Sequence, residues 1–221
     1  MKPIYIIGAG GLGKEVYILI EDINSKKPTY DIKGFIDADL SKKQVKIGKR
    51  IIEVFSEKKF IEKNYQNENI HLAIAIGSPN SISKVSKFYK GISEFIFPNL
   101  IHPTVHYRQD AIVMNEGNII SANSQISVDV EFDSFNFINL TCTIGHDTKM
   151  GSFNVINPGV NLSGGVIVGN NNLIGTNSTI LQYLQIGNNN TITAASFLSK
   201  DVDNNLILVG NPARVMGLNN K

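Results

Sequence analysis

Charged residues, cysteine and tryptophan are scarce in this 221-residue sequence. Asp, Glu, Lys and Arg make up 18% of it, and none of them falls between Met150 and Ser199. With a single cysteine, Cys142, no internal disulfide can form. A net charge of +2 offers no strongly basic face, so no nucleic-acid partner is expected. Because 42% of the residues are hydrophobic, the chain can bury a core, which excludes global disorder.

Long hydrophobic runs are also missing. The N-terminus, MKPIYIIGAGGLG, reaches glycines after a short apolar run. It has neither the apolar segment of a signal peptide nor the roughly 20 apolar residues that a membrane span needs. We therefore expect no membrane span and predict a cytoplasmic protein.

The second half of the chain contains an internal repeat of six residues. At every sixth position from Met114 to Leu198 the residue is apolar. Given the hydrophobic content of 42%, such a run has a chance probability on the order of 10^-6. The residues in this series are Met114, Ile120, Ile126, Phe132, Ile138, Ile144, Met150, Ile156, Leu162, Val168, Ile174, Ile180, Ile186, Ile192 and Leu198.

A period of six residues suits a short strand followed by a bend. Three such units make a coil of about 18 residues, and successive coils stack at the strand spacing of about 4.8 Å. The apolar residue of each unit points inward, and Asn and Gly serve the bends because both tolerate unusual backbone angles. The repeat therefore predicts a parallel β-helix of about five coils, whose hand the spacing leaves open.

The first hundred residues predict an α/β sheet instead. IYIIGAGGLGKEV is typical of a strand over residues 3–8, a glycine turn and a helix from about Gly13. A second predicted strand, IKGFID, ends at Asp37, and a third, HLAIAIG at residues 71–77, leads into a helix that starts near Pro79. This alternation indicates an open, parallel sheet of the doubly wound type.

The glycine turn suggests a phosphate site. Gly8, Gly10 and Gly13 fit the pattern GxGxxG, and Gly11 lies in the same turn. With an acid such as Asp37 after the second strand, this pattern lets the backbone approach a phosphate at a helix N-terminus. A full dinucleotide site needs two mononucleotide halves, and the repeat begins before a second half could fit, which argues against NAD. Two interpretations stay open: a site for one nucleotide diphosphate, and a tight turn with nothing bound.

The two halves together resemble a known family. The repeat and the closing segment VGNPARVMG, residues 209–217, are similar to the hexapeptide-repeat acyltransferases, whose coils wind left-handed and which work as trimers. With GAGGLG near the start and FPNLIHPTV at residues 97–105, the whole chain resembles bacterial sugar acetyltransferases. That group includes N-acetyltransferases of nucleotide-linked 4-amino-sugars and sialic acid O-acetyltransferase-like proteins. The resemblance implies a Rossmann-like α/β subdomain that binds the nucleotide sugar, residues 1–105, and a left-handed parallel β-helix with a C-terminal cap, residues 106–221.

One histidine stands out in the repeat. His146 and Asp147 fall at a predicted bend, where side chains point outward toward a ligand or a neighbouring copy. A neutral imidazole can take the proton of an attacking amine or hydroxyl, and a nearby carboxylate can orient the ring. Since adjacent side chains often point apart, we expect Asp147 to act through a water molecule or across an interface. Gly164 lies 18 residues after His146, at the same corner one coil on, where its N–H can stabilise an oxyanion.

The family resemblance adds roles to these residues. It implies that His146 is the general base, that Asp147 takes the place of an acid that is usually Glu, and that Asn139 belongs to the same set. It also implies that a second histidine's role in acetyl-CoA binding is absent here or passes to Asn157.

Charged groups beyond the last coil are candidates for the coenzyme. Lys200 and Arg214 can meet the phosphates of coenzyme A, and ordinary solvated charges are the alternative. No metal is expected, because a zinc site needs several ligands and the repeat offers one histidine, His146.

These observations predict an acetyl-CoA-dependent N-acetyltransferase that acts on a nucleotide-linked amino-sugar in surface glycan biosynthesis. It would work as a homotrimer, in which the uncharged stretch packs against other copies. The nucleotide would lie against Gly8, Gly10, Gly11, Gly13 and Asp37. The alternatives are an O-acetyltransferase of a sugar hydroxyl such as that of sialic acid, a non-catalytic nucleotide-binding trimeric scaffold and, third, a nicotinamide oxidoreductase.

Overall fold

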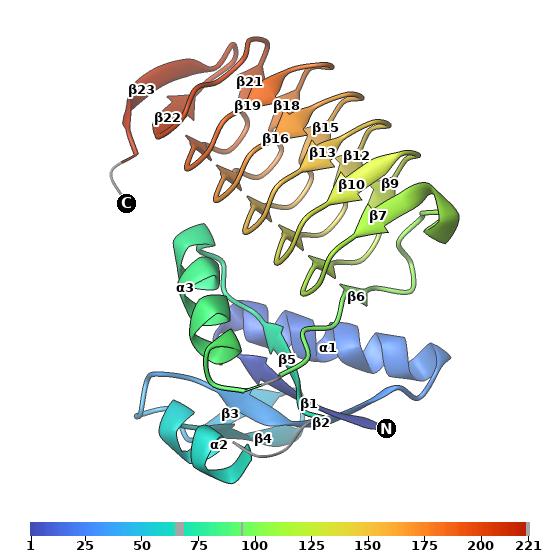
Figure 1. Ribbon diagram of the computed structural model, residues 1–221, viewed down its shortest axis with the longest axis vertical. Coiled ribbons are helices and arrows are strands. Elements are labelled where there is room, and N and C mark those ends of the chain that lie inside the picture. The colour runs from blue at the N-terminus through green and yellow to red at the C-terminus, as the bar shows by residue number, and fades with distance from the viewer. Residues whose placement is uncertain (65–68, 94, 220–221) are drawn as a thin grey trace.

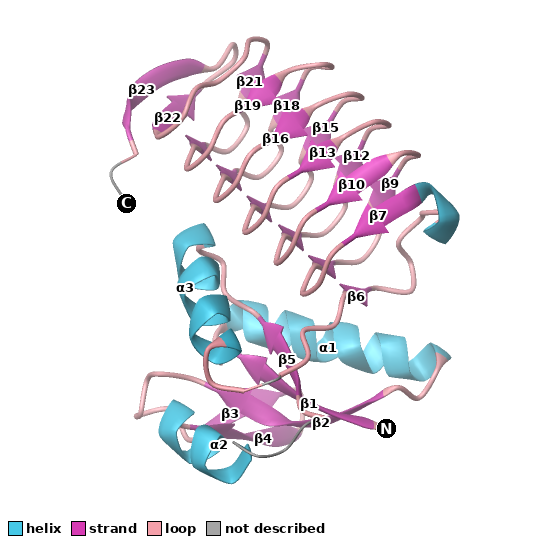
Figure 2. Ribbon diagram, viewed as in Figure 1, coloured by secondary structure: helices cyan, strands magenta, loops and turns pink. Residues whose placement is uncertain are grey.

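A small α/β unit and a three-sided coil make up the molecule, and Figure 1 shows the coil stacked above the α/β unit. This computed structural model describes residues 1–64, 69–93 and 95–219. Figure 2 shows the α-helices in the α/β unit and a short 3-10 helix, Gln109–Ala111, at the start of the coil. In the part of the chain that the structure describes, no helix combines the length and the apolar character needed to cross a bilayer.

The α/β unit contains a mixed five-stranded sheet with strand order β3-β4-β2-β1-β5. Its four neighbouring strands β4, β2, β1 and β5 run parallel, as predicted, but β3 pairs antiparallel with β4. The prediction of a wholly parallel sheet was therefore wrong at this edge, where Gly48, at φ +58°, allows a tight turn. The elements are β1 (Lys2–Ile7), α1 (Gly11–Lys26), β2 (Tyr30–Ile36), β3 (Gln44–Ile47), β4 (Arg50–Phe55), α2 (Glu57–Asn64), β5 (His71–Ile74) and α3 (Pro79–Lys90).

The second half of the chain forms the predicted β-helix of five coils, which is left-handed. Its strands lie in three parallel sheets, and neighbouring strands are 18 residues apart, as in the pairing of Ile144 with Leu162. Strand β6 (Leu100–Ile101) joins one of these sheets beside β8.

The coil elements that follow are η1 (Gln109–Ala111), β7 (Ile112–Met114), β8 (Ile119–Ile120), β9 (Gln125–Ile126), β10 (Val130–Phe132), β11 (Phe137–Ile138), β12 (Thr143–Ile144), β13 (Lys149–Met150), β14 (Val155–Ile156), β15 (Asn161–Leu162), β16 (Ile167–Val168), β17 (Leu173–Ile174), β18 (Thr179–Ile180), β19 (Gln185–Ile186), β20 (Thr191–Ile192) and β21 (Phe197–Leu198). A hairpin of β22 (Leu206–Val209) and β23 (Arg214–Leu218) closes the coil.

The six-residue apolar series lines the interior of the coil. From Ile120 to Leu198 its members are at most 3% exposed, and Met114 at the first strand is partly buried. Burial of this series stabilises the stack, since each buried Ile or Leu side chain contributes roughly 1.5–3 kcal/mol. The prediction of an inward-facing series is confirmed.

A second six-residue series sets the corners. Every sixth residue from Gly117 to Ala195 has a positive φ between 55° and 73°, which turns the chain at the end of each side of the prism. Asn, Asp and Gly favour this left-handed region, and other residue types adopt it at a cost. The corner residues are Gly117, Asn123, Asp129, Phe135, Thr141, Asp147, Phe153, Gly159, Gly165, Asn171, Asn177, Tyr183, Asn189 and Ala195.

Some of the asparagines are interior rather than bend residues. A ladder of buried asparagines, 18 residues apart, runs along one corner of the coil: Asn118, Asn136, Asn154, Asn172 and Asn190. Asn154 Nδ2 donates to Asn136 Oδ1 at 3.0 Å, and Asn172 Nδ2 donates to Asn154 Oδ1 at 3.1 Å. Each side chain also binds backbone groups, as Asn154 Nδ2 does at Gly169 O (2.8 Å). From Asn118 to Asn172 the ladder therefore provides hydrogen-bond partners for polar groups in the narrow interior, whereas Asn190 Nδ2 at its end has no partner among the described residues.

The α/β unit packs against one face of the coil. The outward-facing residues of β8, β11 and β14, Ile119, Phe137 and Val155, are buried in the same hydrophobic cluster as the α/β core. Phe135 joins them, with its ring 5.1 Å from that of Phe97. The two parts therefore hold one fixed arrangement across this apolar contact.

We predict that Asn154→Ala will destabilise the coil by about 3 kcal/mol, because it leaves several buried partners without hydrogen bonds. For a chain of this size the unfolding midpoint should fall by roughly 6–12 °C. Differential scanning calorimetry measures this directly. The control is Asn170→Ala in an exposed ladder, where Asn170 Oδ1 accepts from Ser152 N at 2.7 Å; its midpoint should change by less than half as much. Equal shifts in the two variants would contradict the role of burial.

Candidate active site

The turn between β12 and β13 presents His146 and Asp147 at the surface. Their side chains are 51% and 62% exposed, and His146 Nδ1 lies 2.7 Å from Asp147 Oδ2. Asp147 occupies a corner position at φ +57°, so the backbone turns sharply between the two residues. The expectation that Asp147 acts through water or across an interface was wrong, because this turn brings neighbouring side chains into direct contact.

This contact determines which ring nitrogen is available. The carboxylate of Asp147 accepts a hydrogen bond from a protonated Nδ1, which leaves the lone pair of a neutral ring on Nε2. Among the residues that the structure describes, none makes a hydrogen bond to Nε2. His146 is thus oriented as an acceptor for a proton that comes from outside the chain.

Gly164 forms the floor under the imidazole. A Cβ atom at Gly164 would lie 2.4 Å from His146 Nε2 and 2.5 Å from Cε1, so the ring rests where a side chain would stand. The next residue supports the turn, since Gly165 N donates to His146 O at 2.7 Å. Within the described residues the Gly164 N–H has no hydrogen-bond acceptor, so it can serve a ligand. The structure therefore brings His146 and Gly164 together, as the 18-residue spacing predicted, and places Asp147 in direct contact with the ring.

A pocket of about 340 Å³ opens beside this corner. Gly145 and Thr143 line it from the coil, and His106, Tyr107 and Arg108 line it from the segment that follows β6. The sequence assigned no role to this segment, because nothing in its residues signals a position next to His146.

The other predicted coil residues lie further away. Asn139 is in the turn before β12, so it occupies a different corner from His146, and its Oδ1 accepts from Leu140 N at 2.8 Å. Asn157 stacks one coil beyond Asn139 at that second corner. The structure brings neither of these two asparagines to His146 within one chain.

Lys200 and Arg214 lie toward the C-terminal end of the coil. Lys200 follows β21, 54 residues after His146, which places it at the same corner about three coils on. At roughly 4.8 Å per coil the separation along the axis is about 14 Å. Arg214 begins β23 on the closing hairpin and is exposed. Lys200 therefore continues the line of His146 and Gly164, whereas Arg214 belongs to the cap.

The glycine turn lies at the end of β1, and its glycines serve two purposes. Gly8 has φ +106°, and a Cβ there would lie 2.6 Å from Ala75 O. A Cβ at Gly13 would lie 2.0 Å from Gly8 O, so these two glycines are required by the packing of α1 against the strand. Gly10 and Gly11, by contrast, have nothing within 4 Å of a Cβ and sit at the N-terminus of α1. They leave the helix amides open to a ligand.

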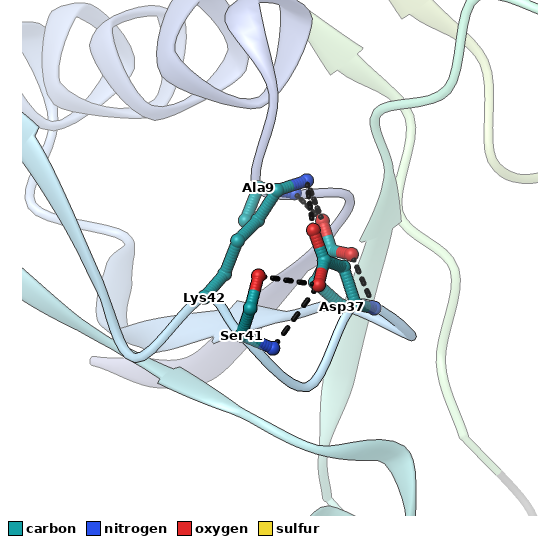
Figure 3. Close-up of polar contacts among 5 residues, drawn as sticks. Ala9, Asp37, Ser41 and Lys42 are labelled. Carbon is teal, nitrogen blue, oxygen red and sulfur yellow. Dashed lines mark hydrogen bonds and ion pairs between the residues drawn. The ribbon is translucent and has the colours of Figure 1, made fainter.

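Asp37 ties the glycine turn to the loop after β2 (Figure 3). Its Oδ2 accepts from Ala9 N at 2.8 Å and from Lys42 Nζ at 3.1 Å, and its Oδ1 accepts from Asp39 N at 2.9 Å. Partial burial by itself would raise the pKa of the Asp37 carboxyl, but these donors together hold it below its usual range. Asp37 is therefore an ionised brace for the turn.

A polar pocket of about 420 Å³ adjoins this brace. Asp37 and Asp39 line one part of it, and Lys42, Lys43 and Lys59 supply positive charge. The lysines were not predicted as site residues, because Lys42 and Lys43 lie in the loop before β3 and Lys59 lies in α2, and no sequence pattern links them to Asp37.

Metal ligands do not gather in the structure as described. No group of three or more His, Cys, Asp or Glu side chains suited to a metal ion occurs among residues 1–64, 69–93 and 95–219. His102 instead contacts Asp22 Oδ2 through Nε2 at 3.0 Å and Thr104 through Nδ1. Burial raises the pKa of the Cys142 thiol to about 11, so this side chain is a packed thiol in the coil interior.

Known proteins are similar to both halves of the chain. The family model of the PglD N-terminal domain matches residues 3–87. A comparison with curated proteins finds no match.

Solved structures cover nearly the whole length. The acetyltransferase domain of PglB from Neisseria gonorrhoeae is 26% identical, with a TM-score of 0.87 over 98% of this chain and 100% of that one. PerB from Caulobacter crescentus, solved with CoA and GDP-perosamine, is 23% identical, with a TM-score of 0.84 over 98% of both chains. WeeI from Acinetobacter baumannii is 21% identical, with a TM-score of 0.82 over 98% of this chain and 100% of that one. The chain therefore carries a PglD N-terminal domain over residues 3–87, and it shares its fold over nearly its full length with the acetyltransferase domain of PglB.

Proposed function

We propose that this protein transfers the acetyl group of acetyl-CoA to the amine of a nucleotide-linked amino-sugar, in the synthesis of a surface glycan. The observation that carries the proposal is the exposed imidazole of His146, held by Asp147 with Nε2 free above Gly164. PerB, which shares the fold, was solved with CoA and GDP-perosamine, and the PglB domain with acetyl coenzyme A. In this proposal residues 1–105 hold the nucleotide and residues 106–221 carry out the transfer.

The reaction uses few groups. The sugar amine attacks the thioester carbonyl, a C–N bond forms, and the C–S bond breaks to release coenzyme A as a thiol. His146 Nε2 takes the proton that the amine loses, and Asp147 stabilises the imidazolium that results. The Gly164 N–H donates to the oxyanion of the tetrahedral intermediate. Water then takes the proton from the imidazolium after product leaves, or the leaving thiolate takes it during collapse.

The two substrates enter along different parts of the chain. The nucleotide lies at the open amides near Gly10 and Gly11, with its diphosphate toward Lys42 and its ribose toward Asp37. Acetyl-CoA runs along the corner from His146 toward Lys200, which meets its phosphates. The exposed Arg214 on the cap and Asn157 on the second corner remain candidates for contacts to the coenzyme.

The geometry favours a site shared between copies of the chain. The α/β unit covers the outward face of β8, β11 and β14, through Ile119, Phe137 and Val155, whereas His146 stands at the opposite corner of the prism. The glycine turn and His146 of one chain are therefore poorly placed to bind and acetylate the same substrate molecule. A homotrimer solves this, because the glycine turn of one copy can face His146 of the next, and Asn139 can reach it in the same way. The protein would act in the cytoplasm, where nucleotide sugars and acetyl-CoA are made.

We predict that His146→Ala will lower kcat by about 10²–10⁴, because the amine loses its proton acceptor. Thiol release from acetyl-CoA with a panel of UDP-, dTDP-, GDP- and CMP-linked amino-sugars measures this. Binding of both substrates, followed by calorimetry, should change little. Structures of the Caulobacter enzyme with one histidine replaced by asparagine or alanine hold both CoA and GDP-perosamine, which is the behaviour expected here. Unchanged turnover would remove His146 from the mechanism, and acetylation of hydroxyl sugars alone would favour the O-acetyltransferase.

We predict that Gly164→Ala will reduce kcat by about tenfold to a hundredfold, since its Cβ would lie 2.4 Å from Nε2 and displace the ring. Gly164 does not have a positive φ, so alanine fits the backbone. The control is Gly217→Ala, where a Cβ meets nothing within 4 Å. Comparable kcat values for wild type and Gly164→Ala would show that the ring position is not critical.

We predict that Asp37→Asn will weaken binding of the nucleotide sugar and will reduce the loss of folding stability at acid pH. The folded pKa of Asp37 is lowered, so its contribution is complete above the unfolded value of about 3.9 and is lost as pH falls through the folded pKa. Thermal unfolding between pH 7 and pH 2 measures the effect: the wild type should lose more stability than the variant below about pH 4. Glu62→Gln is the control, since Glu62 pairs with Lys58 at the surface. Parallel pH curves for wild type and Asp37→Asn would contradict the brace.

A further inference from the structure

Tyr183 is an unusual residue for its position in the coil. It occupies a left-handed corner at φ +61°, where most of the other corner positions hold Asn, Asp or Gly. Two further aromatic residues, Phe135 and Phe153, also occupy such corners. An aromatic residue in this left-handed conformation costs free energy, which favourable contacts of its side chain must offset.

Phe135 and Phe153 pack within this chain, whereas most of the Tyr183 side chain is exposed. Phe135 is 4% exposed, packs against Phe97 of the α/β unit and stacks on Phe153 with ring centroids 5.8 Å apart. Tyr183, by contrast, is 70% exposed, and among the described residues its hydroxyl has no hydrogen-bond partner. The contacts that this chain gives the ring therefore leave most of it open to a ligand.

The ring leans toward the catalytic coil. A Cβ atom at Gly165 would lie 2.3 Å from Tyr183 Cδ1, so the phenol ring rests on Gly165, one coil before its own. Gly165 is the neighbour of Gly164, on which the imidazole of His146 rests from the other side. The turn Gly164–Gly165 is thus enclosed between the two rings.

Tyr183 also lies beside the line from His146 to Lys200. The 18-residue register places Asp147, Gly165 and Tyr183 in one column, beside the column of His146, Gly164 and Lys200. A thioester that reacts above Gly164 and extends toward Lys200 must pass Tyr183. The pantetheine arm of such a thioester is uncharged, in keeping with a stretch from Met150 to Ser199 that has no charged residue.

We propose that Tyr183 binds the pantetheine arm of the acyl-CoA, with the exposed face of its ring packed against the arm next to the thioester. This inference rests on the proposed function. The ring is a binding residue: it anchors the coenzyme and takes no part in the proton transfer at His146. Gly165 belongs to the same proposed site, because any side chain at this position would displace the Tyr183 ring.

The test is Tyr183→Asn, compared with Tyr183→Phe. Asparagine is favoured at left-handed corners, so Tyr183→Asn removes the ring and relieves the backbone at once. We expect the Kd of coenzyme A, measured by calorimetry, and the KM of acetyl-CoA to rise about tenfold in this variant. The KM of the nucleotide sugar should stay the same, and the unfolding midpoint should stay equal or rise. Tyr183→Phe keeps the ring and should stay within about twofold of wild type.

Thr141→Asn is the matched control, since Thr141 is an exposed left-handed residue at another corner. It should relieve the backbone without changing the Kd of coenzyme A. If Tyr183→Asn binds coenzyme A as tightly as wild type, or if its oligomer mass by light scattering falls, the proposal is overturned. The second outcome would make the ring a contact between copies. Wild type that fails to bind coenzyme A at all would instead contradict the proposed function itself.

Discussion

The left-handed residue at each corner is the constraint on which the rest of the structure depends. It recurs every sixth position from Gly117 to Ala195, so each side of the prism has the same length and equivalent residues stack 18 positions apart. Where the corner residue is not Gly, Asn or Asp, the left-handed conformation costs about 1–2 kcal/mol. The interior repays this, because Ile, Leu and Val of the apolar series are buried in every coil and the Asn154 ladder satisfies the polar groups beside them. A single misplaced corner would shift every later residue out of register.

The same constraint creates the proposed active site. At Asp147 the positive φ brings two adjacent side chains into contact, so the carboxylate can hold the imidazole of His146 without a third residue. Stacking then supplies Gly164 beneath the ring and Lys200 further along the same corner. In the α/β unit the glycines divide into two pairs. Close packing requires Gly8 and Gly13, whereas Gly10 and Gly11 are free to face a ligand.

The fold could be predicted from the sequence because its two periodic signals are long and regular. The apolar series gave the five coils, and the strand–glycine–helix pattern gave the parallel strands around β1. The antiparallel β3–β4 hairpin escaped because its signal is short. Among the site residues, the stacking of His146 and Gly164 follows from counting by 18, whereas the direct Asp147 contact depends on a backbone angle. Three further features depend on packing between distant segments, which no local pattern encodes. They are the separation of Asn139 from His146, the lysines near Asp37 and the exposed ring of Tyr183.

The central claim is that the corner of one copy delivers the imidazole to a nucleotide sugar bound by another. A crystal structure with coenzyme A and the preferred nucleotide amino-sugar tests this most directly. The account predicts the amine nitrogen within about 3 Å of His146 Nε2, with the nucleotide in the glycine turn of an adjoining copy. An amine bound far from the imidazole in every copy, with both substrates well ordered, would contradict it.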